Sequence, residues 1–413
     1  MYQLRKYQQE ASDSAVWYLK KYGKPFAIQA ATGAGKSLII AEICHQINDN
    51  VLILQPSKEI LEQNYSKLQS YGITDIGIYS ASKGRKEIAK FTYATIGSIY
   101  KKPDLFKHFK YVIIDECHQV NPKNFSGMYK TFLDAIGCRN VCGLTATPYR
   151  IQSKFVTENG QQVYTATLKM INRIYPFFFK KIVYQIETQE LIEQGYLSPI
   201  EYFAEHQDLG ELVVNTTGAD FTEASIEKFW NTTRLRRIAR AVEYSEKNHT
   251  RTLVFCSSIR QANNAMALLE AMGIKTAIVT GKTPKKERES LIELYKRGEI
   301  KHMLNVGVFT TGFDMPNLDC IVLARPTMSL ALYYQMVGRG VRIDPDNAMK
   351  VLKVYDLAGV VERLGRVETI RVTTEPPENF KNMIMSEVGR MDEVALFRFL
   401  VKRKIFNKGE NDV

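Results

Sequence analysis

Long apolar runs are missing from this sequence. No stretch approaches the roughly 20 apolar residues that a helix needs to cross a bilayer. The amino terminus, Met1 to Lys6, leads into an amphipathic stretch with charges throughout, and it lacks the apolar core of a secretion signal. These absences argue against an integral membrane protein and against an exported one. We therefore expect a protein that acts inside a cell and has no membrane partner.

Cysteines are few and scattered, with no Cys-x-x-Cys pair and no histidine spacing suited to zinc. Cys138 and Cys142 stand four residues apart near the start of an expected strand, which is a poor geometry for a metal or a disulfide. We expect reduced thiols packed in the cores of a cytosolic protein. A cluster of carboxylates of the kind that cuts nucleic acid is also not evident. The six cysteines are Cys44, Cys117, Cys138, Cys142, Cys256 and Cys320.

Acidic residues are in deficit, with 44 against 56 lysines and arginines, a net charge of +12 and a pI near 9.2. This balance favours a polyanionic partner such as nucleic acid, although it serves solubility equally well. The length of 413 residues suggests two or three domains of ordinary size. An apolar content of 45% is enough to build packed cores for them.

Strand and helix patterns alternate over residues 1 to about 150. We expect apolar strands at 26–30, 51–54, 111–115 and 141–145, and helices at 37–47 and 59–68. Continuous apolar strands separated by helices predict a parallel sheet that is covered on both faces. We expect the strand at 111–115 to run beside the strand at 26–30.

A second alternating series begins near Arg251. Its expected strands lie at 252–256, 275–279, 302–306, 320–324 and 352–356, and its helices at 261–272 and 285–296. The architecture of the first series is thus repeated without a short sequence period. Two sheets covered by helices are the predicted result.

The stretch between the two series, about 151–245, is less regular. Strand-like segments at 155–157 and 163–165 flank a turn that contains Gly160, which predicts a hairpin. Arginines 234, 236, 237 and 240 cluster on a predicted helix. Beyond Gly365 a Pro376-Pro377 break precedes an amphipathic helix expected at about 383–402.

The segment Ala30-Ala31-Thr32-Gly33-Ala34-Gly35-Lys36-Ser37 directly follows an expected strand and opens an expected helix. Free backbone N–H groups and the helix dipole attract anions at such a place. The glycines allow close approach of phosphates, Lys36 supplies a charge for the β- and γ-phosphates, and the Ser37 hydroxyl supplies a Mg²⁺ ligand. Ala30 replaces the first glycine of the strict pattern. The segment predicts a site for ATP and Mg²⁺.

Asp115-Glu116-Cys117-His118 follows another expected strand. We expect Asp115 to hold Mg²⁺ partly through water, and Glu116 to orient and deprotonate the attacking water. His118 suits a role in linking the ATP site to domain movement. A four-residue segment of this kind also arises by chance at an acidic strand end. The prediction therefore depends on the phosphate loop earlier in the chain.

Two arginines three residues apart, Arg339 and Arg342, are expected to share one helix face with Gln335 one turn earlier. Arginine fingers stabilise charge on a transferring phosphoryl group. One nucleotide contacted by Lys36 and by these distant arginines implies two domains that close on it. Near the amino terminus, Arg5 and Gln8 can supply an adenine reader, because an amide offers both a donor and an acceptor.

The ordered set resembles the motifs of a superfamily 2 helicase of the DExH type, over about 1–150 and 245–360. Beyond the segments above, the resemblance includes motif Ia at Pro56 to Glu59 with Gln63, motif Ib at Thr95 to Ser98, motif III at Thr145 to Pro148, motif IV at Val254 to Ser257, motif V at Asn305 to Asp314 and motif VI at Gln335 to Arg342.

Within that superfamily, the pattern is similar to the RadD-like group of bacterial DNA-repair helicases and, next, to the phage UvsW-like helicases. The segment Gln194-Gly195-Tyr196-Leu197-Ser198-Pro199 fits this group too. The cysteine-rich extension of RadD-like proteins is not found before Val413. A bacterial cytosol, or a host cytosol if the chain is phage-encoded, is the expected location.

The resemblance implies two tandem RecA-like domains, each a parallel sheet flanked by helices, an irregular inter-domain segment and a C-terminal helical tail. The expected bounds are 1–150 for the first domain, 151–245 for the inter-domain segment, 246–364 for the second domain and 365–413 for the tail. It adds Gly312 and Asp314 to the ATP contacts and makes Thr145 and Thr147 coupling residues with His118. The implied nucleic-acid contacts are Ser57, Lys58, Gln63, Thr95, Ser98, Ser257, Thr280, Gly281 and Lys282.

These features predict an ATP-dependent DNA helicase or translocase in repair, recombination or replication, with one chain sufficient for the ATP site. DNA is favoured over RNA as the partner. Two alternatives stay open: an RNA helicase, because the core motifs do not choose the sugar, and a nucleic-acid-stimulated ATPase subunit that does not unwind. The aromatic residues among 175–181 suit either a wedge that stacks on bases or buried packing.

Overall fold

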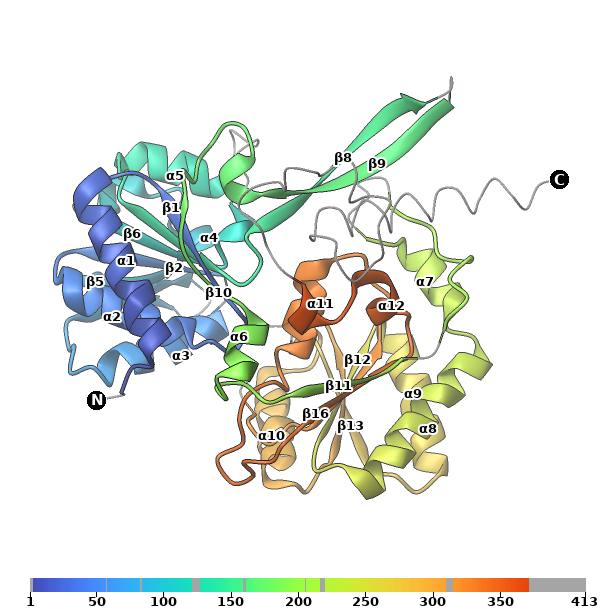
Figure 1. Ribbon diagram of the computed structural model, residues 1–413. Coiled ribbons are helices and arrows are strands. Elements are labelled where there is room, and N and C mark those ends of the chain that lie inside the picture. Colours follow the sequence, from blue (N-terminus) through green and yellow to red (C-terminus); the bar gives the residue numbers. More distant parts are fainter. Residues whose placement is uncertain are drawn as a thin grey trace. The chain divides into compact units, whose positions relative to one another are not determined.

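The computed structural model describes residues 3–56, 58–81, 84–120, 127–158, 161–204, 206–215, 220–309 and 315–370. For residues 58–60, 62, 63, 151–158 and 161–168 it describes the backbone alone. The chain forms two compact units (Figure 1). Unit 1 contains Met1–Arg150 and Lys169–Glu190, and unit 2 contains Ile151–Leu168 and Leu191–Val413.

The sheet of unit 1 is parallel apart from β4, which pairs antiparallel with β3. Its order within the described residues is β10-β1-β7-β6-β2-β5-β3-β4. Every residue of β1, β2 and β7 is buried, as the continuous apolar runs predict. The strands are β1 (Phe26–Ala30), β2 (Val51–Gln55), β3 (Ile76–Ser80), β4 (Arg85–Lys86), β5 (Phe91–Thr95), β6 (Tyr111–Asp115), β7 (Val141–Thr145) and β10 (Ile182–Ile186).

One predicted neighbour relation in this sheet is wrong. β6 does not run beside β1, because β7 pairs with β1 on one side and with β6 on the other. The order of the strands along the chain could not reveal their order in the sheet, since a strand late in the chain can insert between two earlier ones. The consequence is that the loop after β7 stands between the loops after β1 and β6.

Helices cover the sheet of unit 1 on both faces (Figure 1). Since parallel crossovers are right-handed, α2 and α3 lie on one face, and α4 and α5, whose crossovers run back across the sheet, lie on the other. Helix α1 packs on α2 and on β10. The helices are α1 (Lys6–Tyr22), α2 (Lys36–Ile47), α3 (Lys58–Gln69), α4 (Ile96–Ile99) and α5 (Met128–Ile136).

Unit 2 has a parallel sheet in the order β11-β16-β15-β12-β14-β13. Helices α8 and α9 pack together, and the reversal of direction after β13 places α10 and α11 on the opposite face. The strands are β11 (Ile200–Ala204), β12 (Thr252–Cys256), β13 (Thr276–Thr280), β14 (His302–Val306), β15 (Cys320–Ala324) and β16 (Leu352–Asp356). The main helices are α7 (Glu223–Phe229), α8 (Thr232–Asn248), α9 (Ile259–Ala271), α10 (Lys285–Arg297) and α11 (Leu330–Val337).

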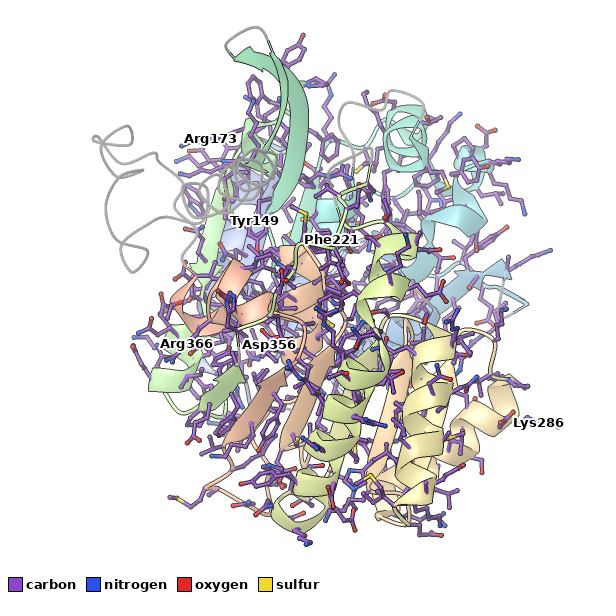
Figure 2. All side chains as sticks on the ribbon, turned by 90° about the vertical axis from the view of Figure 1, so that its right-hand side faces the viewer. Tyr149, Arg173, Phe221, Lys286, Asp356 and Arg366 are labelled. Carbon is purple, nitrogen blue, oxygen red and sulfur yellow. The ribbon has the colours of Figure 1, made fainter. Side chains whose placement is uncertain are left out.

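A short helix, α12 (Val360–Leu364), follows the last strand of unit 2. Asp356, labelled in Figure 2, starts it: its carboxylate accepts hydrogen bonds from the backbone N–H groups of Ala358 (3.0 Å) and Val361 (2.7 Å). The description ends at Ile370, so the predicted helix at 383–402 lies outside it.

The stretch 151–245 has more regular structure than its sequence suggests. The predicted hairpin is confirmed as β8 (Tyr149–Glu158) paired with β9 (Gln161–Met170). Two further strands, β10 and β11, add an edge to each sheet, and α6 (Thr188–Glu193) lies between them in the chain. Edge strands are half exposed, so β10 and β11 lack the continuous apolar run by which the central strands were recognised.

The thiols of all six cysteines are free, and those of five are buried, with Cys138 partly exposed. Burial raises the pKa of the Cys138 thiol to about 11 and keeps it protonated. Over the described ranges, no helix is long and apolar enough to cross a membrane, and no group of histidine, cysteine or acidic side chains is arranged to hold a metal ion by itself.

Candidate nucleotide-binding site

The candidate site in unit 1 lies at the carboxyl edge of its sheet. Strands β1, β7 and β6 are parallel neighbours, so the loops that follow them meet at one edge. These loops carry the phosphate-loop, motif III and motif II residues. The next strands, β2 and β5, end at the same edge, and they lead to motifs Ia and Ib. The edge therefore gathers five segments that are far apart in the sequence.

The phosphate loop has the backbone that a phosphate cradle requires. Gly33 and Gly35 both have left-handed φ angles, +89° and +77°, which side chains other than glycine adopt at a cost. A Cβ atom at Gly35 would lie 2.5 Å from the Gln8 amide nitrogen. Because α2 starts at Lys36, its first N–H groups face the loop. The loop, with Thr32 and the buried Ala34, fits a bound phosphate chain.

Gln8 rests against this loop. Its Oε1 accepts the Arg5 backbone N–H (3.0 Å), and its Nε2 donates to the Ala34 carbonyl (3.0 Å). Tyr7, which sequence reasoning did not single out, donates from its hydroxyl to the same carbonyl (2.8 Å). The predicted adenine reader is thereby joined to the phosphate loop, and the neighbouring buried tyrosine holds the same carbonyl.

Lys36, Glu116 and His118 form a chain of charged and polar contacts. Lys36 Nζ lies 3.4 Å from one carboxylate oxygen of Glu116, and His118 Nδ1 lies 3.3 Å from the other. Glu116 has a left-handed backbone, with φ at 50°, a conformation that costs energy in a non-glycine residue and is common at functional sites. This backbone directs the carboxylate toward Lys36 rather than along the strand.

The two motif II carboxyl groups differ in their electrostatics. Burial raises the pKa of Asp115, and the negative charge of Glu116 adds to the rise, while Lys36 opposes it. Burial also acts to raise the pKa of Glu116, but Lys36 and His118 outweigh it and lower this pKa below its usual range. Glu116 is thus held ionised, which is the form that can accept a proton. A divalent cation would favour ionised Asp115.

Asn64 connects the two predicted Mg²⁺ ligands. The Ser37 hydroxyl donates to Asn64 Oδ1, and the Asn64 side chain also acts on Asp115, lowering its pKa against the larger effect of burial. A hydroxyl and a carboxylate held beside one amide fit the oxygen ligands that Mg²⁺ takes. Sequence reasoning missed Asn64, although it occupies the buried stripe of α3 between Leu61 and Leu68, where a polar residue needs a reason.

The motif III threonines lie next to His118. His118 Nδ1 is 2.8 Å from the Thr145 hydroxyl and 3.4 Å from the Thr147 hydroxyl. The Thr145 oxygen also accepts the backbone N–H of Thr147 (3.0 Å). A continuous path of contacts therefore runs from Lys36 through Glu116 and His118 to Thr145 and Thr147. Their role in coupling stays a prediction.

Replacing Gly143 by alanine should disturb this path. A Cβ at Gly143, in the middle of β7, would lie 2.6 Å from Cys117 Sγ and 2.8 Å from Phe179 Cε1. Cys117 adjoins Glu116, so we expect a loss of about 1–3 kcal/mol of unfolding free energy from overpacking and slower ATP turnover. Thermal unfolding measures the first. Gly97→Ala, whose methyl group would meet no atom within 4 Å, should leave stability unchanged; equal stabilities of the two variants would contradict the packing.

In unit 2, the three motif VI residues do not share a helix face, contrary to the prediction. Helix α11 ends at Val337, and Gln335 lies in its last turn. Arg339 follows in a turn in which its N–H donates to the Met336 carbonyl (3.3 Å), and Arg342 forms a bridge with Leu197. A Cβ at Gly340 would lie 2.4 Å from Leu352 Cδ1, so the chain passes close to β16 just after the helix. Both arginines are partly exposed.

The predicted nucleic-acid contacts are described only in part. Thr95 and Ser98 lie together after β5, with their hydroxyl oxygens 2.8 Å apart. In unit 2, the Ser257 N–H donates to Gln261 (2.6 Å), and Thr280 accepts the Lys282 N–H (3.1 Å). Gly281 and Lys282 are exposed beyond the carboxyl end of β13. Ser57, Gly312 and Asp314 lie outside the described residues, as do the side chains of Lys58 and Gln63.

The aromatic stretch divides between the two roles considered for it. Phe179 is 2% exposed and packs beside Gly143, whereas Tyr175 and Phe177 are 73% and 50% exposed and contact each other. Packing therefore accounts for Phe179, while a contact with bases stays a prediction for the exposed pair alone.

Two family matches fall one in each unit. Residues 1–150 match the family described as Type III restriction enzyme, res subunit. Residues 233–344 match the helicase conserved C-terminal domain. The two matches support the superfamily 2 helicase that the sequence motifs predict.

Known helicases and translocases are similar to this chain in sequence. IRC3 of Saccharomyces cerevisiae, named as a candidate ATP-dependent helicase, is 27% identical over 364 residues, which cover 82% of this chain and 49% of IRC3. The DNA 3'-5' translocase XPB2 of Sulfurisphaera tokodaii is 23% identical over 390 residues, covering 84% of this chain and 81% of XPB2. The chain spans about half the length of IRC3.

A solved structure confirms the fold. The fragment structure of a candidate HsdR subunit of a type I restriction enzyme from Vibrio vulnificus superposes with a TM-score of 0.62 at 20% identity, covering 92% of this chain and 68% of that one. The chain has two RecA-like domains, each with a parallel sheet flanked by helices.

Proposed function

We propose that this protein is an ATP-dependent DNA helicase or translocase. The observation that carries the proposal is the contact path from Lys36 through Glu116 and His118 to Thr145, at the edge where the phosphate loop and motif II meet. It links the predicted phosphate-binding group and proton acceptor to the motif III threonine at the end of β7. Such a link suits a motor more than a simple kinase.

In this proposal, each polar group of the site has one role. Lys36 and the loop N–H groups bind the β- and γ-phosphates, and Ser37 and Asp115 hold the Mg²⁺ ion, which supplies charge neutralisation when bound. Glu116, kept ionised by Lys36, orients the attacking water and accepts its proton. Arg339 and Arg342 stabilise charge on the transferring phosphoryl group, with Gln335 beside them. Arg5, Gln8, Gly312 and Asp314 complete the predicted nucleotide contacts.

Movement along DNA follows from the same edge of each sheet. Motifs Ia and Ib follow β2 and β5 in unit 1, and Ser257 and the 280–282 turn follow β12 and β13 in unit 2. Hydroxyl, amide and lysine groups suit contacts to phosphates, which carry no base information. His118, Thr145 and Thr147 would pass the state of the nucleotide to these loops. A role in repair, recombination or replication, and kinship with the RadD-like or UvsW-like groups, belong to this proposal.

A second candidate is a motor that translocates on duplex DNA without unwinding it, as a subunit of a restriction complex. The family description of residues 1–150 and the similarity to an HsdR subunit favour it. Since no carboxylate cluster for cutting is evident in the sequence, the nuclease would come from a partner.

The deciding experiment compares ATPase rates with single-stranded, duplex, forked and four-way DNA and with RNA. We expect stimulation by DNA that weakens steeply as salt rises, because each phosphate contact releases counterions. Stimulation by RNA alone would remove the DNA proposal, and no stimulation by any nucleic acid would remove the motor. Displacement of a third strand from intact duplex, without separation of a fork, would select the second candidate.

A further inference from the structure

Residues 194–199 lie beside motif VI of unit 2. The Ser198 N–H donates to the Val341 carbonyl (2.7 Å), and the Ser198 hydroxyl donates to the Arg342 carbonyl (3.0 Å). Leu197 forms an antiparallel bridge with Arg342. Sequence reasoning noted this segment only as part of a family resemblance. In the structure this segment holds the backbone of Arg342, the second candidate arginine finger.

A buried lysine holds the same carbonyl from another side. Lys350 is 4% exposed, and its ammonium donates to the carbonyls of Arg342 (2.6 Å) and Pro316 (2.5 Å). The Arg342 carbonyl thus accepts two side-chain hydrogen bonds. Pro316 follows the motif V residues by two positions, so one ammonium joins the ends of motifs V and VI.

These contacts gather at the amino edge of the sheet of unit 2. Leu197 and Ser198 precede β11, Pro316 precedes β15, and Lys350 precedes β16, and these three strands are neighbours. The Leu352 N–H also donates to the Pro199 carbonyl (2.8 Å). The segments that precede three neighbouring strands therefore lie close to the backbone of Arg342.

A charge at this place is costly for stability. Burial lowers the pKa of Lys350 to about 8, against the opposing effect of Asp344 and Asp319, and Arg342 lowers it further. An apolar side chain of the same length would avoid the desolvation penalty. The ammonium offers what an apolar chain cannot, which is two directed hydrogen bonds to the carbonyls of Arg342 and Pro316.

We propose that Ser198 and Lys350 form a clamp that positions Arg342 for ATP hydrolysis by this protein and couples its backbone to the end of motif V. This inference rests on the proposed function, because it gives Arg342 a role in turnover. Ser198 and Lys350 are positioning residues: they hold the backbone of Arg342 and touch no reacting atom. An error of about 1 Å in the place of such a group can cost 100-fold in rate.

The test measures DNA-stimulated ATP hydrolysis by Ser198→Ala and Lys350→Met in the full chain. We expect kcat to fall about 3- to 10-fold for Ser198→Ala and about 10- to 100-fold for Lys350→Met, as neutral and charged hydrogen bonds differ. The KM for ATP should change less than about threefold, since ground-state binding rests on unit 1. Ser245→Ala is the control, because it removes a buried hydroxyl of unit 2 that donates to the Val242 carbonyl (2.7 Å) and accepts from the Thr252 hydroxyl (3.0 Å).

The pH dependence separates a clamp from a packing role. The ratio of wild-type to Lys350→Met kcat should shrink as pH rises through about 8, because the ammonium loses its proton there. Since the pKa of Lys350 is lower in the folded than in the unfolded protein, its titration makes folding more favourable as pH rises above about 8. Unfolding of the wild type therefore cannot explain a smaller kcat ratio. A ratio constant with pH, or wild-type kcat in Ser198→Ala, would overturn the clamp.

Lys36→Ala, assayed in parallel, distinguishes failure of the clamp from failure of the proposed function. If Lys36→Ala is inactive while both clamp variants turn over ATP like the wild type, the clamp alone is wrong. If Lys36→Ala hydrolyses ATP normally, the proposed function and the clamp are both wrong. Should Lys350→Met fail to fold by circular dichroism, Ser198→Ala and its control decide the question.

Discussion

Replacing Lys36 by alanine is expected to lower kcat for ATP hydrolysis by at least about 10³-fold, because the site loses its phosphate-neutralising ammonium. The substitution also removes the partner 3.4 Å from Glu116. With that charge gone, the pKa of Glu116 should rise toward that of an ordinary buried carboxyl group. The proton acceptor and the phosphate anchor are thus lost together. Steady-state ATPase assays at saturating DNA measure the effect.

The control for Lys36 is Lys24→Ala, an exposed lysine in the same unit, which should hydrolyse ATP like the wild type. Thermal unfolding at pH 7 should show Lys36→Ala folded, since the loop backbone depends on Gly33, Gly35 and the Ala34 contacts with Tyr7 and Gln8. Substantial turnover by folded Lys36→Ala would show that the loop is not the catalytic nucleotide site.

Arg339→Ala is expected to lower kcat by about 10³- to 10⁵-fold, the range seen for arginine fingers. The physical reason is the loss of a guanidinium that binds charge only as the phosphoryl group transfers, so ATP binding should change little. Single-turnover hydrolysis together with nucleotide binding separates the two effects. Arg339→Lys should not restore the rate, because an ammonium cannot reproduce the fork of N–H donors.

Arg297→Ala is the matched control for Arg339, because its side chain is 69% exposed on α10 of the same unit. It should behave like the wild type in both assays. Normal hydrolysis by Arg339→Ala, with Arg297→Ala also normal, would remove the prediction that motif VI contributes to the ATP site.

The elements that the sequence predicts well are those with a local signature. The runs at 26–30, 111–115, 252–256 and 320–324 are buried strands in the structure, because a strand covered on both faces must be apolar throughout. The strands β10 and β11 are partly exposed and have no such run. The buried strands β3 and β5 carry glycine, serine or threonine among their apolar residues, and all four strands were missed. The order of strands is a non-local property, and the insertion of β7 between β1 and β6 could not be inferred from any single segment.

The order of the amino acids alone located the phosphate loop and the motif II acids, because glycine conformations, a helix start and a strand end are local. Tertiary structure decided what surrounds them. It placed Asn64 between Ser37 and Asp115, and Tyr7 on the carbonyl of Ala34. It also took Arg342 off the expected helix and fixed its backbone through Ser198 and Lys350. Such contacts join residues far apart in the chain, so they exist only once the sheets have formed.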